Sequence, residues 1–312
     1  MATLGVDLGG TNIKAALVDE AGYILREISK PTNLPRPAES VCDDIIGLCR
    51  ELMVGNDVRG IGVGCPGTVD DSCGMVLYSN NLAWFDFAMG PYLEQRLQVP
   101  VRLANDANAA ALGEALAGCA KNADSAVILT LGTGVGGGVV LNGKLLTGYT
   151  GAASEPGHMV VNDAQDAPLC SCGRRGCLEA YASATALIRM TQQAMHLHPE
   201  SALWKIAGPM AVTGRTAFDG QAMGDAVATA VVEEYTHWLA IGTANLINIF
   251  FPQVVGLSGG IANQGENLLA PLRTQVEPMI FGNAFTHKKT KLVACTLGYR
   301  AGVIGAALLA RK

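Results

Sequence analysis

The stretch Ala126–Leu141, AVILTLGTGVGGGVVL, decides how the rest of the chain is interpreted. Its first six residues are β-branched or apolar and predict a buried strand. Gly132-Thr133-Gly134 and three more glycines at 136–138 follow, and a second apolar run ends at Asn142-Gly143, a strong hairpin signal. Glycines at this density leave backbone N–H groups open to a ligand, which suits phosphate oxygens. A tight β-hairpin with a bulge is the alternative interpretation of this stretch alone.

The start of the chain repeats this pattern. Leu4–Asp7 predicts a strand, Gly9-Gly10-Thr11 a glycine turn and Ile13–Val18 a second strand, and Tyr23–Ile28 predicts a third. The distance between the two patterns is too long for a solenoid repeat. We therefore expect two related α/β domains, each offering a glycine-threonine hairpin to one cleft that holds a nucleoside triphosphate.

Length and composition fit this organisation. The 312 residues are 49% hydrophobic and 16% charged, which favours two folded domains over a disordered chain. The net charge of −5 argues against nucleic acid as a partner. Lys288-Lys289 beside Lys291 is the nearest approach to a basic cluster, and we interpret it as a solvated loop. With no targeting segment or membrane span in the sequence, we expect a cytoplasmic protein whose nine cysteines are reduced or metal-bound.

Polar side chains follow the predicted strands of the first domain. Arg59–Gly64 predicts a buried strand that leads into Gly67, and a polar-aromatic loop around Asn81 follows, either a small-molecule contact or an ordinary surface turn. Asn105 and Asp106 stand between a short strand, 101–104, and a helix predicted over 109–117. Ligands bind at the carboxyl ends of strands in open α/β sheets. We therefore interpret Asp106 as a general base for a hydroxyl that attacks phosphorus, with N-capping as the alternative.

The second domain carries a metal-ligand pattern of the form H-x11-C-x-C-x4-C. Its members are His158, Cys170, Cys172 and Cys177. Three thiolates and one imidazole make a closed tetrahedral Zn²⁺ site of the structural type, with no open position for water. A metal-free thiol cluster is the alternative.

Two carboxylates flank this pattern. A zinc ion would fix Glu155 and Glu179 relative to each other, and such a pair can accept hydrogen bonds from the adjacent hydroxyls of a polyol. Surface glutamates are the alternative interpretation.

The remaining elements complete the predicted division into domains. A third glycine turn, Gly259-Gly260, follows the strand predicted over 254–258 and is placed to approach a nucleotide. Further predictions are helices over 89–97 and 222–250 and a strand over 291–294. A helix of small residues over 298–310 is expected to pack on the first domain. We expect one domain at 1–118, joined by the helix at 298–312, and a second at 119–297 with the zinc loop.

With these residues in view, the sequence resembles the ROK family (repressors, open reading frames and kinases), and within it the bacterial glucokinases. The resemblance covers essentially the whole chain. It rests on the order of seven motifs: Asp7–Thr11, Pro66–Asp70, Asn105–Asn108, Leu131–Gly138, Glu155–His158, Cys170–Glu179 and Ser258–Gly260.

The resemblance implies a fold, an activity and a set of ligands. The family fold is a pair of actin-like, ribonuclease H-like ATPase domains, and the activity is transfer of the γ-phosphate of ATP to the 6-hydroxyl of a hexose with Mg²⁺. Asp106 matches the catalytic base, and Asp7 lies near the metal. The resemblance implies hexose contacts at Gly67, Asn81, Asn105, Asp106, Glu155, His158 and Glu179. It implies nucleotide contacts at Asp7, Gly9, Gly10, Thr11, Lys14, Gly132, Thr133, Gly134, Gly259 and Gly260.

One departure from the family leaves the sugar open. The family usually has Gly-Glu-x-Gly-His with an aliphatic x, whereas this chain has Ser154 and Pro156 around Glu155. Proline fixes its own φ and biases the preceding residue toward extended conformations. Glucose therefore stands beside allose, mannose, N-acetylglucosamine and N-acetylmannosamine as candidate substrates.

The resemblance also raises two non-enzymatic alternatives and a partner. Sugar-responsive ROK transcription factors carry a helix-turn-helix domain ahead of the first motif, and we expect none here because only six residues precede Asp7. A scaffold without catalysis is disfavoured by the intact Asp106 and zinc loop. The family suggests a homodimer.

Overall fold

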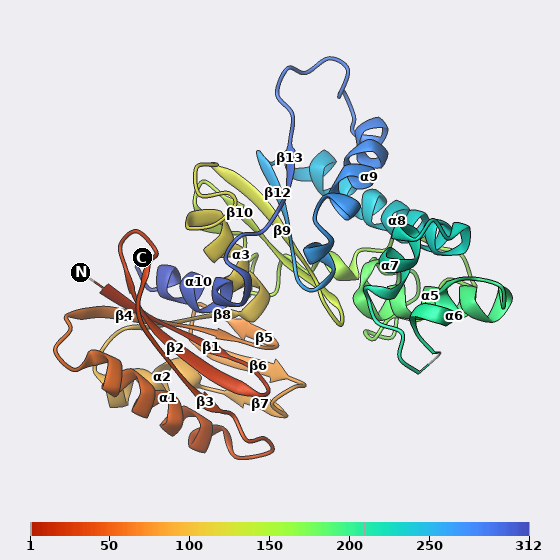
Figure 1. The fold of residues 1–312 in the computed structure, drawn as a ribbon. Coiled ribbons are helices and arrows are strands. Elements are labelled where there is room, and N and C mark those ends of the chain that lie inside the picture. Colours follow the sequence, from red (N-terminus) through yellow and green to blue (C-terminus); the bar gives the residue numbers. More distant parts are fainter. Residues whose placement is uncertain (1, 209, 312) are drawn as a thin grey trace. The chain divides into compact units, whose positions relative to one another are not determined.

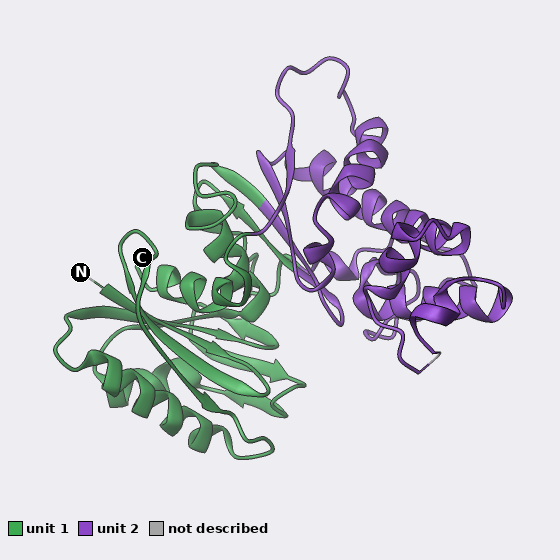
Figure 2. Cartoon of the chain, viewed as in Figure 1, with its two compact units in different colours: residues 1–126, 137–154, 296–312 green, residues 127–136, 155–295 purple. Residues whose placement is uncertain are grey.

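The computed structural model describes residues 2–208 and 210–311. The chain forms two compact units (Figure 2). Unit 1 contains residues 1–126, 137–154 and 296–312, and unit 2 contains residues 127–136 and 155–295. Residues 119–126 and 137–154 thus group with unit 1, whereas the sequence predicted them in the second domain. The backbone N–H of Asn142 donates to the carbonyl of Asp124 at 2.7 Å, and Gly138 packs against Ala111, which explains the grouping.

Unit 1 is built on a five-stranded sheet in the order β3-β2-β1-β4-β8 (Figure 1). β1 pairs antiparallel with β2 and β2 with β3, while β1, β4 and β8 run parallel. The bounds are β1 (Ala2–Leu8), β2 (Asn12–Asp19), β3 (Ile24–Pro31), β4 (Val58–Cys65) and β8 (Val101–Asn105).

A second five-stranded sheet repeats this order as β11-β10-β9-β12-β13. Numbered within its own set, each sheet has the order third, second, first, fourth, fifth. This repetition confirms the expected pair of related α/β domains. The bounds are β9 (Ser125–Leu131), β10 (Val135–Leu141), β11 (Lys144–Leu145), β12 (Val254–Ser258) and β13 (Lys291–Ala294).

A small antiparallel sheet, β5-β6-β7, follows β4 in unit 1. Its strands are β5 (Thr68–Asp70), β6 (Met75–Ser79) and β7 (Trp84–Phe87). From sequence, a loop is predicted around Asn81 and no strand is predicted in this region. Strands of three to five residues with exposed side chains such as Tyr78 and Phe85 give little periodicity to detect.

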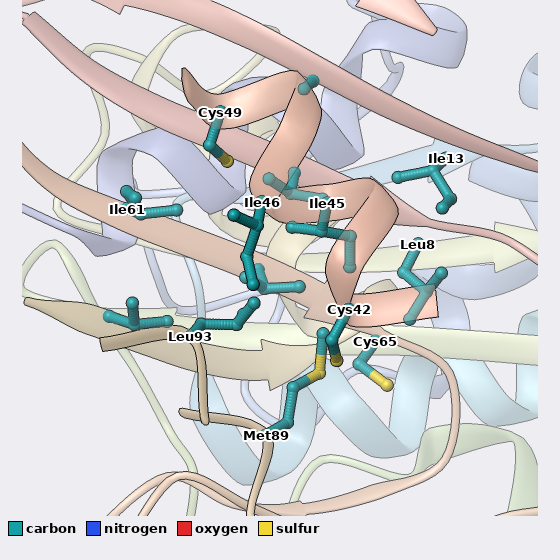
Figure 3. Close-up of a cluster of buried hydrophobic side chains, with 14 of the residues drawn as sticks. Leu8, Ile13, Cys42, Ile45, Ile46, Cys49, Ile61, Cys65, Met89 and Leu93 are labelled. Atoms are coloured by element: carbon teal, nitrogen blue, oxygen red, sulfur yellow. The ribbon is translucent and has the colours of Figure 1, made fainter. Parts of the chain in front are cut away.

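Helices α1 (Ala38–Met53) and α2 (Met89–Leu97) cover the core of unit 1. Figure 3 shows Cys42, Ile45 and Cys49 of α1 among the buried side chains of this core, with Ile61 of β4 and Leu93 of α2. Both cysteines are fully buried and act as small apolar residues.

Helix α10 (Ala301–Leu309) packs closely on β1 and β4, because glycines of the two strands leave room for its backbone. A Cβ on Gly5 would lie 1.9 Å from the carbonyl oxygen of Val303, and one on Gly62 would lie 1.8 Å from that of Ala306. The C-terminal helix is therefore an integral part of unit 1, where it also contacts α3 (Asp106–Leu116).

Unit 2 is mostly helical outside its strands. Its α-helices are α4 (Glu179–Ala182), α5 (Ala184–Leu197), α6 (Leu203–Ile206), α7 (Thr216–Ala222), α8 (Ala226–Phe250) and α9 (Glu266–Val276). Short 3₁₀ turns are η1 (Pro156–His158), η2 (Ile261–Gln264) and η3 (Glu277–Met279), with η4 (Gly298–Arg300) in unit 1. Within the described residues, no helix combines the length and apolar character that crossing a membrane requires.

Candidate functional site

The junction between β8 and α3 places Asp106 at the carboxyl end of a parallel strand. Asn105 caps the helix, because its Oδ1 accepts hydrogen bonds from the backbone N–H groups of Ala107 at 2.9 Å and Asn108 at 3.2 Å. The helix thus begins at residue 106 and not at the predicted 109. Asp106 accepts one bond from the N–H of Ala107 at 2.9 Å, but Asn105 holds the N-cap position.

Two carboxylates of unit 1, those of Asp106 and Asp7, have raised pKa values. Burial raises the pKa of Asp106, against hydrogen bonds from Ala107 and neighbouring groups that lower it. Burial also raises the pKa of Asp7 on β1; the nearby charge of Lys14 opposes that shift, and the charge of Asp106 adds to it. A partly buried carboxylate with a raised pKa at a strand end is suited to accept a proton.

Gly67 connects the β8–α3 junction to the small sheet. The amide Nδ2 of Asn105 donates to the carbonyl of Gly67 at 3.0 Å. Gly67 has a φ of 106°, and a Cβ there would lie 2.1 Å from the carbonyl oxygen of Tyr78 on β6. Asn81 lies exposed in the turn that follows β6. Gly67 and Asn105 are thus brought together, with the Asn81 turn starting beside Gly67.

The first glycine turn joins β1 to β2. The N–H of Gly9 donates to the carbonyl of Asn12 at 2.9 Å, and the hydroxyl of Thr32 donates to the carbonyl of Gly9 at 2.7 Å. No protein atom lies within 4 Å of the Cβ position of Gly10, so its backbone is open to a ligand. Lys14 lies opposite Asp7 in the β1–β2 register.

The second and third glycine turns lie side by side in unit 2. Gly259 follows β12 with a φ of 89°, and a Cβ there would lie 2.3 Å from the carbonyl oxygen of Leu131, the last residue of β9. Gly132 begins the turn after β9. The Cβ positions of Gly132 and Gly260 are open, as at Gly10. Each expected nucleotide turn therefore has one glycine with room at its Cβ position, although the backbone N–H of Gly132 donates to the carbonyl of Gly134 at 3.0 Å within its own turn.

The predicted metal ligands converge in unit 2. One ligand atom each from His158, Cys170, Cys172 and Cys177 lies within 4.8 Å of all the others. The Cys170 Sγ is 3.6 Å from the His158 Nδ1, and the Cys172 Sγ is 3.7 Å from the Cys177 Sγ. Tetrahedral bonds of about 2.3 Å to sulfur and about 2.0 Å to nitrogen put neighbouring ligand atoms roughly 3.5–3.8 Å apart. The donor set and its spacing fit Zn²⁺.

Two glycines and an arginine shape the ligand loop. Gly173 and Gly176 have φ values of 85° and 76°, and a Cβ on Gly176 would lie 1.6 Å from the carbonyl oxygen of Asn162. The guanidinium of Arg174 donates to the carbonyl of His158 at 2.9 Å. Hydrogen bonds from the backbone and side chain of Arg174 lower the pKa of Cys172 to about 6.

Glu179 links the ligand loop to the second glycine turn. Its Oε1 accepts from the hydroxyl of Ser171 at 2.6 Å, and its Oε2 accepts from the N–H of Val135 at 3.1 Å. A Cβ on Gly134 would lie 2.3 Å from the same Oε2. The structure thus brings Glu179 together with the metal ligands, as predicted, and also with the glycine turn, which was not predicted.

Glu155 precedes η1 and is exposed. Its φ and ψ are −98° and 66°, outside the helical region as expected before proline. The carbonyl of Glu155 accepts from the N–H of His158 at 3.1 Å, so this carboxylate and the metal ligand share one tight turn. Ser154 has a φ of 68°, the left-handed region that favours glycine.

Three residues with a role in this geometry escaped the sequence analysis: Ser171, Arg174 and Thr185, whose hydroxyl donates to the carbonyl of Thr133 at 2.8 Å. Ser171 and Arg174 lie inside the quoted cysteine stretch, so their position was the available signal. Thr185 has none, because 52 residues separate it from its partner.

Comparison with known proteins agrees with this arrangement. The ROK family model matches residues 3–312. The chain is 38% identical to a glucokinase of Thermotoga maritima over 99% of its own length and 97% of the relative. It is 28% identical to a xylose repressor of Bacillus spizizenii, over 97% of its length and 75% of that protein.

A solved structure provides a fuller match. The crystal structure of a ROK family glucokinase from Streptomyces griseus, in complex with glucose and AMPPNP, is similar with a TM-score of 0.79. It is 37% identical and covers 100% of this chain and 99% of that one. The fold is accordingly the actin-like, ribonuclease H-like pair of ATPase domains. Matched over almost its entire length, the chain belongs to the ROK family.

Proposed function

We propose that this protein is an ATP-dependent hexose kinase that transfers the γ-phosphate of ATP to the 6-hydroxyl of glucose. The observation that carries the proposal is the carboxylate of Asp106. It is partly buried at the carboxyl end of β8 and has a raised pKa, while Asn105 serves as the N-cap. Glucokinases whose sequences are 35–38% identical to this chain support glucose as the substrate.

Asp106 would act as general base. One of its carboxylate oxygens takes the proton of the sugar 6-hydroxyl while the hydroxyl oxygen attacks the γ-phosphorus in line. The bond between the γ-phosphorus and the oxygen that bridges it to the β-phosphate breaks, and ADP leaves. Asp7 would hold Mg²⁺, which neutralises the charge of the phosphates when bound.

The three glycine turns would hold the triphosphate. Gly10, Gly132 and Gly260 leave room at their Cβ positions, and Gly9, Thr11, Thr133, Gly134 and Gly259 shape those turns. The Lys14 ammonium, opposite Asp7, would face the phosphate charge. Glycine turns of this kind bind phosphate through backbone N–H groups.

Each unit has residues that are expected to bind the sugar. Unit 1 would supply Gly67, Asn81, Asn105 and Asp106, and unit 2 would supply Glu155, His158 and Glu179. The Nδ1 of His158 faces Cys170, so the imidazole would bind Zn²⁺ through Nδ1 and offer Nε2 to a sugar hydroxyl.

Zinc would have a structural role. The three cysteines and His158 fill all four tetrahedral positions and leave none for a reacting water. The ion would fix the loop from which His158 and Glu179 project.

We also propose that the protein forms a homodimer, as the family resemblance suggests. A measurement of the molecular mass in solution tests this.

The test is ADP release with Mg-ATP across glucose, mannose, allose, fructose, N-acetylglucosamine and N-acetylmannosamine. The proposal expects a kcat/KM for glucose at least tenfold above the others. A preference for another aldohexose would leave the proposed mechanism unchanged and would change the assignment of the substrate. No turnover on any sugar, with sugar still bound, would favour a sensing role such as the similarity to a xylose repressor suggests.

A further inference from the structure

A second cavity lies in unit 2, apart from the groups assigned above. It has a volume of about 430 Å³, within the range of ligand pockets. It lies among α9, η3, the first residues of β13 and the loop that joins η3 to β13. In Figure 1 this loop projects beyond α9 and β13. Lys288, Lys289 and Lys291, interpreted from sequence as part of a solvated loop, line this cavity.

The cavity carries an excess of positive charge. Within the described part of the chain, no carboxylate forms an ion pair with Lys288, Lys289 or Lys291. The ammonium of Lys289 donates to the carbonyl and side-chain oxygens of Asn283, which are neutral acceptors. Arg273 also lines the cavity, but Glu266 holds its guanidinium at 2.7 and 3.2 Å.

One carboxylate, Glu277, faces these lysines. Its Oε1 accepts from the Nδ2 of Asn283 at 3.2 Å. Three lysines against one carboxylate leave an excess of two positive charges. A phosphate monoester carries a charge of about −1.5 to −2 at neutral pH, which matches this excess.

Most of the remaining lining is apolar. Phe251, Ile280 and Val293 present apolar surface to it, and Phe251 is 47% exposed although the residue is large and hydrophobic. Apolar surface beside a cluster of cations suits a ligand with an apolar or aromatic body and an anionic group. Inorganic phosphate alone would leave the apolar part unused.

The cavity is separate from the expected nucleotide turn. Lys291 pairs with Val254, the first residue of β12, whereas Gly259 follows the last residue of that strand. Five residues of strand at about 3.3 Å each place the two ends of β12 roughly 13 Å apart. A ligand in the cavity would approach the start of β12, and the nucleotide turn follows its end.

We propose that this cavity is a binding site for an organic phosphate, a phosphate monoester with an apolar or aromatic body. The three lysines would neutralise the phosphate, and the face formed by Phe251, Ile280 and Val293 would cover the body of the ligand. The site does not depend on the kinase activity proposed above.

Phenyl phosphate is the probe, with binding measured by isothermal titration calorimetry on the full chain. The variant Lys288→Gln/Lys291→Gln removes two exposed ammonium groups, and Lys121→Gln/Lys205→Gln is the matched control, because both of its lysines are exposed elsewhere. We expect the first variant to weaken binding at least tenfold and the control to leave it within twofold. Both variants should keep the wild-type melting temperature.

Two outcomes would overturn the proposal. Equal binding of phenyl phosphate to the wild type and to Lys288→Gln/Lys291→Gln, or no binding to either, would place no site at these lysines. Binding at the expected nucleotide turns would give the first of these results. Inorganic phosphate that binds as tightly as phenyl phosphate would contradict the organic ligand class; we expect it to bind at least tenfold more weakly.

Discussion

The carboxylate of Glu179 accepts a hydrogen bond from the backbone N–H of Val135 at 3.1 Å, directly after the second glycine turn. The same side chain accepts from Ser171 in the metal-ligand loop. A group proposed to bind sugar is thus held by a turn proposed to bind nucleotide. A substitution that displaces the metal-ligand loop should therefore also displace the second glycine turn, and the reverse should hold.

The substitution Gly134→Ala should weaken sugar binding without lowering the stability of the fold. The new Cβ would lie 2.3 Å from the Glu179 Oε2 and displace it, but that atom ends a flexible side chain and can move. We expect the KM for glucose to rise about tenfold or more, since small displacements of positioning groups are costly, with little change in melting temperature. Gly132→Ala is the control, because its Cβ position is open, and it should raise the KM for ATP alone. Wild-type kinetics in Gly134→Ala would show that Glu179 does not bind the sugar.

Asp106→Asn should abolish proton transfer and keep the site intact. Asparagine preserves the shape and the bond from the N–H of Ala107, but it takes no proton. We expect kcat to fall about 10²–10⁴-fold with the Kd for glucose within threefold, measured by steady-state kinetics and calorimetry. A variant with more than a tenth of the wild-type kcat would remove Asp106 from the mechanism.

The carboxylate of Asp106 should also contribute to the pH dependence of the protein's stability. Burial raises its pKa in the folded protein, so the folded state binds the proton more tightly than the unfolded state. Stability from this group is therefore present at low pH and lost as pH rises through the raised value. Above that value, Asp106→Asn should melt at a higher temperature than the wild type, and the difference should shrink on acidification.

Asp44→Asn provides a control of opposite sign. Partial burial works against ionisation of Asp44, but its hydrogen bonds with Lys30 and Arg36 lower its pKa overall. This variant should melt below the wild type at neutral pH. If Asp106→Asn is also less stable than the wild type at pH 7–8, the burial of a charged Asp106 is not the unfavourable contribution that we describe.

Sequence predicted the regular elements best where strong local signals bound them. Strand β12, strand β13 and helix α2 have the predicted limits, and at β12 the apolar run ends at Gly259-Gly260. Helix α8 begins at Ala226 and not at the predicted 222, since the side chain of Asp225 accepts from the N–H of Ala228 and caps it. Capping choices between neighbouring polar residues depend on side-chain geometry that periodicity does not contain.

The site residues were predictable as residue types but not as contacts. The convergence of His158 with the three cysteines was predictable because the identity and spacing of candidate ligands are local in sequence. The bond between Glu179 and Val135 joins residues 44 positions apart and depends on how α4 packs against the glycine turn. No periodicity or spacing rule contains such a contact, which forms only in the folded chain.

Removing the metal should disorganise the sugar side of the site. Cys177→Ser deletes one of four ligands, and we expect less than 0.1 zinc per chain by mass spectrometry, against about one in the wild type. Glucose binding should be lost, because His158 and Glu179 project from the same loop. Cys73→Ser is the control, since Cys73 is exposed and outside the cluster. An unchanged KM for glucose after chelation would show the metal to be dispensable.

Ser154→Gly should be nearly silent. Glycine removes the cost of a left-handed φ of 68°, about 1–2 kcal/mol, but loses the bond from the Ser154 hydroxyl to Leu146 at 2.8 Å, about 0.5–1.5 kcal/mol. The two effects nearly offset, and the backbone already has the conformation that glycine favours. We expect kcat/KM for glucose within threefold of the wild type. A change above tenfold would mean that Ser154 itself tunes the sugar site.

The central claim is phosphoryl transfer from ATP to the 6-hydroxyl of glucose with Asp106 as base. Uniformly ¹³C-labelled glucose and Mg-ATP, followed by ³¹P and ¹³C NMR, test it most directly, with Asp106→Asn as the control. The account predicts a phosphate ester whose phosphorus couples to C6 of glucose, formed by the wild type and nearly absent with the variant. A phosphate on another carbon, or equal product from both proteins, would contradict it.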